Sequence, residues 1–421
     1  MPRSGARGGH RPSEVAAHTA GMTDATPRPF PDGTPQAASL RDLLAGHPAV
    51  LCDSPPGAGK STMVAKVVSW LHTHTDATVA VATFTNEQGT AIAAAISHEL
   101  GVDGRGLPQV QVASRNMAVP AGAAAPGART GSNPVTVRTV ASCKINPPDV
   151  DVMVFDEAYQ VTFADFSKAA DRAEQVLLVG DPGQIGPVIA FNVGAWSHLR
   201  QAPQMRAPEV LAARNGVARH SLQHTYRLGP DTAAAIAPLY PFTFDSARPE
   251  RHLDGLDGEI ACVLVPERPD PYDLATMRSV ARAATDYVGR VLVERDENGR
   301  PRTRPLGQDD VAIVVSRNAQ ASALEALLLE AGVPGITVGT ADRLQGGQWH
   351  AVVAVDPTLS GAESEHALSS GRLCVMTSRH MTHLTWVYDP GWEDVLEQAS
   401  DPEDAGRAAS VRAALVTYPH R

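Results

Sequence analysis

Cysteine and lysine are both scarce in this sequence. Among 421 residues there are only four cysteines, and they lie far apart with no CxxC pair (Cys52, Cys143, Cys262 and Cys374). This spacing argues against a disulfide framework or a zinc knuckle, and we expect a reducing, cytoplasmic environment. Only four lysines are present, so nearly all of the positive charge is carried by arginine.

The sequence also lacks an excess of positive charge and any long hydrophobic run. Its 36 Lys and Arg residues face 46 Asp and Glu residues, which gives a net charge of −10. Bulk charge therefore does not hold the protein on nucleic acid, and any nucleic-acid site must be local. No run comes near the roughly 18 apolar residues of a membrane span, and no signal-like apolar segment follows the first arginines, so we expect neither secretion nor membrane insertion.

Short apolar runs alternate with segments of helical character along the rest of the chain, of which 43% is hydrophobic. The runs lack polar and apolar alternation, as is typical of strands buried on both faces of a parallel sheet. They form two series: residues 49–52, 79–83, 135–139, 151–155 and 175–180, then 259–265, 310–316, 336–339, 350–356 and 383–389. We predict an α/β fold with two domains, 30–216 and 217–421, after a disordered leader over 1–29. The Gly- and Pro-containing stretch 117–134 is expected to be a surface loop.

A glycine-rich turn between an apolar strand and an amphipathic helix indicates a phosphate site. Residues 51–71 read LCDSPPGAGKSTMVAKVVSWL, in which Ser54 takes the place of the first glycine of a P-loop. Backbone N–H groups of the turn would bind a β-phosphate, Lys60 would reach the β- and γ-oxygens, and Ser61 would ligate Mg²⁺. The predicted nucleotide and Mg²⁺ contacts are Gly57, Ala58, Gly59, Lys60, Ser61 and Thr62. The alternative is a turn that only joins a strand to a helix.

Acidic and amide side chains follow two later apolar runs, at the edge where open α/β sheets bind ligands. Asp156 and Glu157 come directly after residues 151–155. Asp156 would hold Mg²⁺ through its water shell, and Glu157 would act as general base for an attacking water. Gln184, in VGDPGQIGPV, lies just past the run 175–180, where its amide can contact a γ-phosphate. The alternatives are a solvated strand end for the acids and an ordinary Gly-Asp-Pro-Gly turn.

The order of these motifs resembles that of superfamily 1 helicases, in the branch of the nonsense-mediated-decay and senataxin-type helicases. The resemblance runs from about Gln36 to about Asp389 and includes an AAA_12/AAA_30-like P-loop NTPase core. Six segments carry it: SPPGAGKST (54–62), DEAYQ (156–160), GDPGQIGPV (180–188), LQHTYRLGP (222–230), DRLQGGQWHAVV (342–353) and RLCVMTSRH (372–380). The branch has DEASQ in place of DEAYQ. Six motifs in the family's order are much harder to obtain by chance than one.

The resemblance implies two tandem RecA-like P-loop NTPase domains with parallel sheets, an ATP site in the cleft between them, and single-stranded DNA or RNA bound across both. By position, Gln36 would read adenine, Tyr226 would stack on the base, and Gln348 stands where the family has an ATP-site glutamate. Arg227 and Arg379 would be arginine fingers, because a guanidinium stays charged and grips phosphate oxygens; the alternative is a buried arginine paired with a carboxylate. The implied nucleic-acid contacts are Thr83, Thr85 and Asn86 in the first domain and Thr340, Arg343 and Gln345 in the second.

We expect a nucleic-acid-stimulated ATPase that acts as a helicase or translocase and moves 5′ to 3′ as the family does, plausibly as a monomer. Three departures favour ATPase activity over strong unwinding: Gln348 replaces a glutamate, Met381 replaces the last arginine of the final motif, and residues 62–79 leave no room for the family's extra β-barrel. The first alternative is an ATP-gated nucleic-acid clamp with little turnover, and the second is a small-molecule kinase. His350 and His380 flank motif residues, but such histidines are usually not catalytic.

Overall fold

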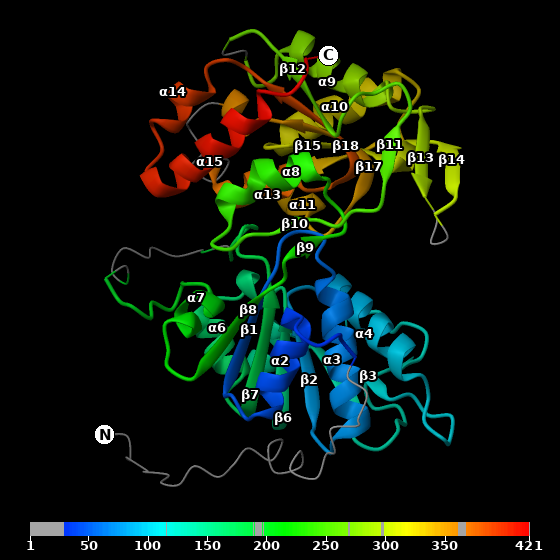
Figure 1. Ribbon diagram of the computed structural model, residues 1–421, viewed down its shortest axis with the longest axis vertical. Helices are drawn as coiled ribbons and strands as arrows, with labels where there is room; N and C mark the ends of the chain where they lie inside the picture. The colour runs from blue at the N-terminus through cyan, green and yellow to red at the C-terminus, as the bar shows by residue number, and fades with distance from the viewer. Residues whose placement is uncertain are drawn as a thin grey trace. The chain divides into compact units, whose positions relative to one another are not determined.

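The chain folds into two compact units, shown in Figure 1. The computed structural model describes residues 29–420, apart from 115, 188, 190–195, 197, 268–269, 296–298 and 361–367, so all but the last residue of the predicted leader lies outside the described residues. The first unit comprises the residues up to Ser54, Gly59–Asp181 and Gly186–Leu222, and the second comprises Pro55–Ala58, Pro182–Ile185 and the residues from Gln223 onward. The boundary falls after Leu222 rather than after residue 216, because residues 217–221 pair with the first unit's sheet.

The first unit contains an eight-stranded sheet in which neighbouring strands are parallel, in the order β4-β3-β5-β2-β6-β7-β1-β8. Its strands are β1 (Ala49–Asp53), β2 (Val79–Thr83), β3 (Val110–Val112), β4 (Ala123–Ala124), β5 (Val135–Thr139), β6 (Val150–Asp156), β7 (Ala173–Gly180) and β8 (Val217–Ser221). The five runs of the first series are β1, β2, β5, β6 and β7, which confirms the predicted parallel sheet. The other three strands were not predicted, since they are short or carry polar side chains, and β4 lies within the expected loop 117–134.

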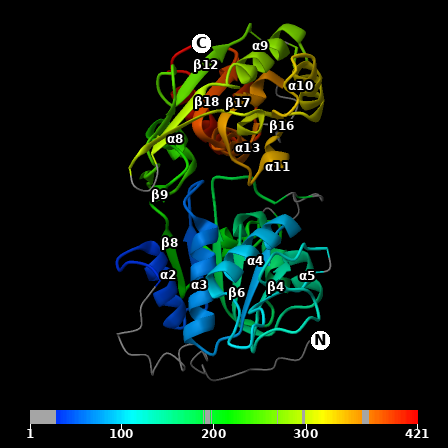
Figure 2. The same cartoon turned by 90° about the vertical axis from the view of Figure 1, so that its right-hand side faces the viewer.

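Helices cover both faces of this sheet. They are α2 (Pro35–Leu44), α3 (Lys60–His74), α4 (Asn86–Leu100), α5 (Val140–Ile145), α6 (Phe163–Ala169) and α7 (Ala207–Ala212). The last three form a buried apolar cluster with β1, β6 and β7. Figure 2 shows α2 and α5 on opposite sides of the sheet. The loops at the carboxyl ends of the strands are thereby left at one edge, where the candidate site residues lie.

The second unit contains a five-stranded parallel sheet in the order β12-β18-β17-β15-β16. Its strands are β12 (Ile260–Leu264), β15 (Val311–Val315), β16 (Thr337–Thr340), β17 (Trp349–Val355) and β18 (His380–Tyr388). Its helices are α8 (Pro230–Ile236), α9 (Leu274–Thr285), α10 (Asn318–Glu330), α11 (Ala341–Leu344), α13 (Ser370–Thr377), α14 (Trp392–Leu396) and α15 (Pro402–Leu415). The strands are the five runs of the second series, so the second predicted parallel sheet is also confirmed.

Alternate residues of the second sheet point to opposite faces, as the pleat of a strand requires. Ala312 and Val314 of β15 belong to a buried cluster with α8, α13 and α15. Val311, Ile313 and Val315 of the same strand belong to a separate cluster with α9 and α10. This sheet is therefore buried on both faces, which explains the continuous apolar character of its strands. Across the described residues no helix has both the length and the hydrophobicity that crossing a membrane requires.

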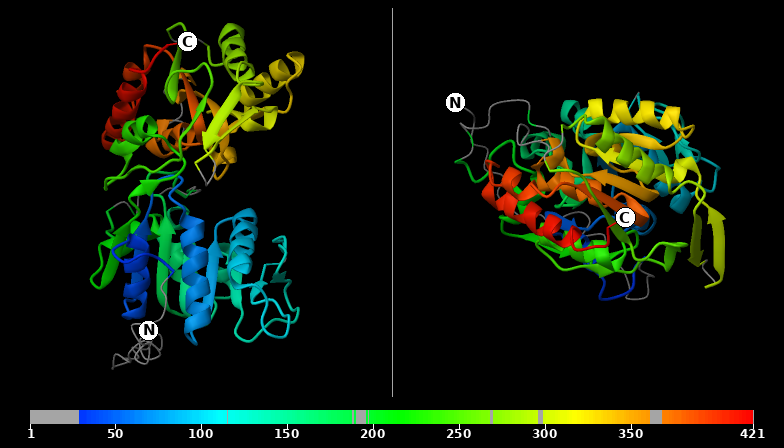
Figure 3. Two further views of the ribbon diagram at one scale, coloured as in Figure 1. Left: turned by 45° about the vertical axis from the view of Figure 1, so that its right-hand side comes forward. Right: turned by 90° about the horizontal axis from the view of Figure 1, so that it is seen from above.

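Two smaller strand groups in the second unit were not predicted. β11 (Arg251–Leu253), β13 (Val291–Arg295) and β14 (Pro301–Pro305) form an antiparallel sheet in that order, visible in Figure 3. β9 (His224–Thr225) and β10 (Asp245–Ser246) form a short parallel pair. All five residues of β14 are exposed, and the strand begins and ends with proline. These strands carry few apolar residues, so no hydrophobic run marked them in the sequence.

A buried ion pair connects α15 to the end of β17 and gives a prediction about stability. Arg412 donates from Nε to both carboxylate oxygens of Asp356, at 3.0 and 2.9 Å, and both side chains are fully buried. Removal of one partner leaves a buried unpaired charge, so we expect Asp356→Ala to lower the free energy of unfolding by about 3–5 kcal/mol in urea denaturation. Arg407→Ala, which removes a surface ion pair on the same helix, should cost less than about 1 kcal/mol. Equal losses in the two variants would contradict the prediction.

Candidate functional site

The turn between β1 and α3 has the backbone of a phosphate-binding loop. Gly57 and Gly59 are both left-handed, with φ of +72° and +81°, a conformation that residues with a side chain adopt only at a cost. α3 begins at Lys60, and within the described residues no side chain caps its first N–H groups. Such N–H groups, at the positive end of a helix, bind anions such as phosphate. Ser61 and Thr62 are exposed in the first helical turn.

Ser54, which replaces the first glycine of the P-loop pattern, connects this turn to the neighbouring strand β7. Its side chain is fully buried, and its N–H and Oγ both donate to the carbonyl oxygen of Gly180, at 2.9 and 3.1 Å. Gly180 has no room for a side chain, because a Cβ there would lie 2.9 Å from Cδ2 of Tyr159 and 3.0 Å from the nitrogen of Ala158. The ends of β1 and β7 and the DEAYQ turn are therefore packed closely together.

Asp156 and Glu157 lie at the carboxyl end of β6, beside Lys60. The ammonium nitrogen of Lys60 is 3.6 Å from Oε1 of Glu157, and the N–H of Glu157 donates to Oδ1 of Asp156 at 3.0 Å. Burial, and then the charge of Glu157, raise the pKa of Asp156 to about 7, although Lys60 and this N–H oppose the rise. Glu157 is left-handed, with φ of +55°, which costs about 1–3 kcal/mol in a residue other than glycine. Buried acids and backbone strain of this kind are typical of functional sites.

These residues fit a nucleoside triphosphate together with a divalent cation. Mg²⁺ would relieve the repulsion between the two carboxylates, with the hydroxyl of Ser61 as a direct ligand and Asp156 holding the ion through its water shell. Lys60 and the N–H groups of the turn would neutralise the phosphates. In the ranges that the structure describes, no group of three or more His, Cys, Asp or Glu side chains is placed to hold a metal ion. A Mg²⁺ site does not require such a group, because Mg²⁺ retains several water ligands.

A further carboxylate, Asp53, is buried at the end of β1 just before the P-loop. Its Oδ1 accepts from the hydroxyl of Tyr159 at 2.8 Å, and its Oδ2 accepts from Nε and Nη2 of Arg219, both at 2.7 Å. Burial, and then the charge of Asp53, raise the pKa of Tyr159, so its hydroxyl remains a donor. Asp53 thus joins β1, β8 and the turn after β6. This network was not predicted, and its one signal in the sequence is the tyrosine of DEAYQ, where the branch that the motifs resemble has a serine.

The predicted nucleic-acid residues of the first unit have local hydrogen-bonding roles. Thr83 is fully buried, and its hydroxyl donates to the carbonyl oxygen of Thr85 at 3.0 Å. Oγ1 of Thr85 caps α4 by accepting from the N–H of Gln88 at 3.2 Å. Oδ1 of Asn86 is buried without a hydrogen-bond partner among the described residues. Phe84, between the two threonines, is 46% exposed, and it was not predicted because a single aromatic residue in a polar loop forms no pattern.

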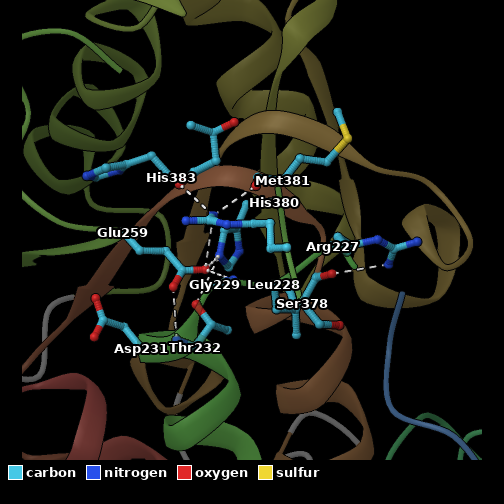
Figure 4. A network of polar contacts seen from close by, with 12 residues as sticks. Arg227, Leu228, Gly229, Asp231, Thr232, Glu259, Ser378, His380, Met381 and His383 are labelled. Carbon is cyan, nitrogen blue, oxygen red and sulfur yellow. Dashed lines mark hydrogen bonds and ion pairs between the residues drawn. The ribbon is translucent and has the colours of Figure 1, made fainter. Parts of the chain in front are cut away.

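Two predicted ATP residues of the second unit, Arg227 and Arg379, lie on neighbouring segments. Arg227 donates from Nε to Oε1 of Gln348 at 3.1 Å and from Nη1 to the carbonyl oxygen of Ser378 at 3.3 Å, as Figure 4 shows for the second bond. Arg379 is only 1% exposed. It donates from Nε to the carbonyl oxygen of Val375 at 3.2 Å and from Nη2 to the hydroxyl of Ser378 at 3.0 Å. The structure therefore brings Arg227, Gln348 and the Arg379 segment together.

The first half of the P-loop, residues 55–58, groups with the second unit. Oγ1 of Thr225 donates to the carbonyl oxygen of Pro56 at 2.6 Å, and the N–H of Tyr226 donates to the carbonyl oxygen of Gly57 at 3.0 Å. A Cβ on Gly57 would overlap with the side chain of residue 227. Gly57 is thus brought together with two predicted ATP residues, and the side chain of Tyr226 is 53% exposed.

The remaining predicted residues are more dispersed. Oε1 of Gln184 accepts from Nε2 of Gln345 at 3.4 Å, so these two are in contact within the second unit. Thr340 precedes α11 and Arg343 is exposed on that helix, and neither contacts Gln184 through a hydrogen bond in the described residues. Gln36 is half-buried in the first turn of α2, in the first unit.

A family comparison covers the first half of the chain. Residues 33–235 match the model of a family described as an AAA domain. The match includes the P-loop, the acid pair and Gln184, so this part of the chain is similar to AAA-type P-loop domains. A search of curated proteins gave no match.

Solved structures similar to this chain include three helicases. The structure of the PRRSV helicase is 16% identical, with 85% of this chain and 54% of that chain covered and a TM-score of 0.44. Arterivirus nonstructural protein 10 (helicase) is 16% identical, with 84% of this chain and 61% of that chain covered and a TM-score of 0.46. The structure of its complex with DNA is 15% identical, with 85% of this chain and 66% of that chain covered and a TM-score of 0.47. The chain thus spans 54–66% of these proteins. All three of these proteins are helicases, while the resemblance of this chain to the nonsense-mediated-decay and senataxin branch stays a prediction.

The Asp53 network gives a prediction for Tyr159. Tyr159→Phe removes a hydrogen bond to a buried charged acceptor, so we expect the free energy of unfolding to fall by about 1.5–3 kcal/mol. Urea denaturation followed by circular dichroism measures this change. Tyr272→Phe, at a side chain that is 46% exposed, is the matched control and should leave stability unchanged. If both variants unfold at the wild-type urea concentration, the hydroxyl of Tyr159 has no stabilising role.

Proposed function

We propose that this protein is a nucleic-acid-stimulated ATPase of the superfamily 1 helicase type, with ATP and Mg²⁺ bound at the P-loop. The observation that carries the proposal is the arrangement at the end of β6, where Lys60 lies 3.6 Å from Glu157 beside the glycine turn and the buried Asp156. The AAA domain match over residues 33–235 supports nucleotide binding. The combination of a strained acid, a buried acid and a lysine at a phosphate loop suits phosphoryl transfer.

The proposed reaction transfers the γ-phosphoryl group of ATP to water. Glu157 orients the water and accepts its proton while a bond forms between the water oxygen and the γ-phosphorus. The bond between that phosphorus and the β,γ-bridging oxygen breaks, and the bridging oxygen leaves with ADP. Lys60 offsets the charge on the phosphate oxygens, and Gln184 contacts the γ-phosphate. When bound, Mg²⁺ supplies further positive charge to the same oxygens.

The proposal extends to the second unit through its arginines. In this account Gln36 and Tyr226 contact the base of ATP, and Arg227 and Arg379 act as arginine fingers. Gln348 and the carbonyl group that bind Arg227 are neutral acceptors, which orient a guanidinium without cancelling its charge.

The proposed partner is single-stranded DNA or RNA, along which the protein moves 5′ to 3′. An acidic protein suits this partner only through local contacts, which the predicted polar residues and Phe84 would provide. An exposed aromatic ring can stack on any base, so such contacts carry little sequence preference. The four cysteines are buried and none of them forms a disulfide bond, which is compatible with the proposed cytoplasmic location.

An ATP-gated clamp is the second candidate, and Gln348 is the observation that favours it. Its amide accepts from Arg227 where the related helicases have a glutamate, so a charge is missing from this position. A clamp would bind nucleic acid more tightly with ATP but would show no stimulated turnover. Measurement of turnover therefore separates the two candidates.

Substitution of the two central site residues tests the ATPase proposal. We expect single-stranded nucleic acid to stimulate ATP hydrolysis by the wild type, and Lys60→Ala and Glu157→Gln to lower kcat about 100-fold or more, because charge neutralisation or the general base is lost. Phosphate release is measured in separate titrations with single-stranded DNA and RNA. Lys66→Ala, on the same helix, is the control and should keep the wild-type rate. Unchanged rates in both site variants would exclude the assigned site, and nucleic-acid binding without stimulated turnover would favour the clamp.

Phe84 provides a test of the nucleic-acid surface. Stacking of one base on an aromatic ring contributes about 1–3 kcal/mol, so we expect Phe84→Ala to weaken binding of single strands ~5- to 150-fold. Fluorescence anisotropy with labelled oligothymidylate and oligouridylate measures the affinity. Ile145→Ala, at an 87% exposed side chain of the same unit, should bind as the wild type does. Equal affinities for the two variants would remove Phe84 from the proposed surface.

A further inference from the structure

A buried carboxylate in the second unit, Glu259, joins the two segments that carry Arg227 and Arg379. Glu259 lies directly before β12 and is 4% exposed. Its Oε1 accepts from the N–H of Gly229 at 2.6 Å and from Nε2 of His380 at 3.0 Å, as Figure 4 shows. Gly229 comes two residues after Arg227, and His380 directly follows Arg379. A single oxygen atom thus binds two segments that are far apart in the sequence.

The other carboxylate oxygen of Glu259, Oε2, also accepts a hydrogen bond. Oε2 of Glu259 accepts from the N–H of Thr232 at 3.2 Å, and the hydroxyl of Thr232 is 3.0 Å from Nε2 of His380. A Cβ on Gly229 would overlap with Oε2, so a side chain at that position would displace the carboxylate. Burial opposes the ionisation of Glu259, but the hydrogen bond from His380, the charge of Arg248 and the Gly229 N–H hold the pKa of this carboxyl below its ordinary value. The network therefore contains a charged carboxylate.

His380 is a neutral donor in this network. The residue is fully buried, and burial lowers its pKa against the opposite effect of Glu259. Nδ1 has no hydrogen-bond partner in the described part of the chain, so a second proton would create a buried unpaired donor. The imidazole is therefore assigned the tautomer with its proton on Nε2, directed at Glu259.

Two arginines extend the network to the backbone of the same two segments. Nη1 of Arg248 is 3.4 Å from Oε1 of Glu259 and donates to the carbonyl oxygen of Met381 at 3.0 Å. Arg251 donates from Nε to this same carbonyl oxygen at 2.7 Å and from Nη2 to the carbonyl oxygen of Arg227 at 2.8 Å. A planar guanidinium can bind both carbonyl groups at once, whereas the single ammonium group of lysine lacks this forked geometry.

We propose that Glu259 is a positioning residue that holds residues 226–229 and 378–381 in one arrangement, with Arg251 bridging the same two segments. Arg227 and Arg379 then keep a fixed geometry relative to each other. The inference rests on the proposed ATPase function. Glu259 is buried and acts through the backbone of these segments. A displacement of catalytic groups by about 1 Å is enough to lower a rate about 100-fold, so such a residue has a measurable effect.

Glu259→Gln tests the proposal in the complete chain. The amide has nearly the same shape, but it has no charge and only one acceptor oxygen. If that oxygen takes the place of Oε1, the N–H of Thr232 loses its acceptor, and if the amide nitrogen takes that place, both segments lose theirs. We expect kcat of nucleic-acid-stimulated ATP hydrolysis to fall ~10- to 100-fold, with much less change in KM for ATP, because the phosphate loop is intact. Arg251→Lys keeps the charge but lacks the guanidinium fork, and it should lower kcat in the same direction by a smaller factor.

Leu328→Ala is the matched control. Leu328 is buried on the opposite face of the same sheet, so its truncation lowers stability without touching the network. Thermal unfolding followed by circular dichroism shows the loss of stability in each variant, and kcat is compared at a temperature at which all are folded. The control should keep the wild-type kcat. An equal fall of kcat in the control and in Glu259→Gln would indicate a general effect of stability and would overturn the proposal.

The remaining outcomes separate this inference from the proposed function. If Lys60→Ala abolishes hydrolysis while Glu259→Gln and Arg251→Lys keep the wild-type kcat, the positioning role is wrong and the ATPase function stands. If the wild type shows no stimulated hydrolysis, the ATPase function fails and the positioning role fails with it. Should Glu259→Gln not fold, Arg251→Lys decides by the same criterion.

Discussion

The adjacent carboxylates of Asp156 and Glu157 are the constraint on which the candidate site depends. Asp156 is buried, Glu157 has a strained backbone, and Lys60 is the positive side chain next to them. Such an arrangement persists only when its surroundings leave no alternative. The bonds of Ser54 to Gly180, and the close approach of Gly180 to the DEAYQ turn, provide that rigidity. The rest of the first unit therefore stabilises a turn that would be unfavourable in isolation.

Parallel strands explain how residues from distant parts of the chain come together. Every strand of the first sheet ends at the same edge, so the phosphate loop after β1, Phe84 after β2 and the acids after β6 follow strands of one sheet. The second unit repeats the principle with five parallel strands. In the second unit, networks of polar side chains hold the loops at the ends of the strands in place. Glu259 and its arginines fix two loops by hydrogen bonds to their backbone rather than by packing alone.

The sequence was sufficient for the strands and motifs whose signal is local, and insufficient for contacts between distant residues. Most of the buried parallel strands contain a near-continuous apolar run, so they were visible in the sequence, whereas β13 has only three consecutive apolar residues and β14 carries arginine and proline. The phosphate loop and DEAYQ are each contained in a few consecutive residues. Asp53 and Glu259 are single acids whose neighbours in the sequence form no motif that involves them. Several of their hydrogen-bond partners lie more than 100 residues away in the sequence. Residue type also does not reveal which hydroxyl groups form hydrogen bonds with the neighbouring backbone. The hydroxyls of Thr83 and Thr85 both do so.

The proline residues that bound β14 have a consequence for association between molecules. This strand is the outer member of its small sheet and is exposed throughout, a situation in which a free edge can recruit a strand from another chain. Pro301 and Pro305 lack the N–H group that such pairing requires, and Arg302 and Arg304 place charge between them. The edge is thereby a poor template for cross-chain β-pairing, so the small sheet can stay exposed without promoting aggregation.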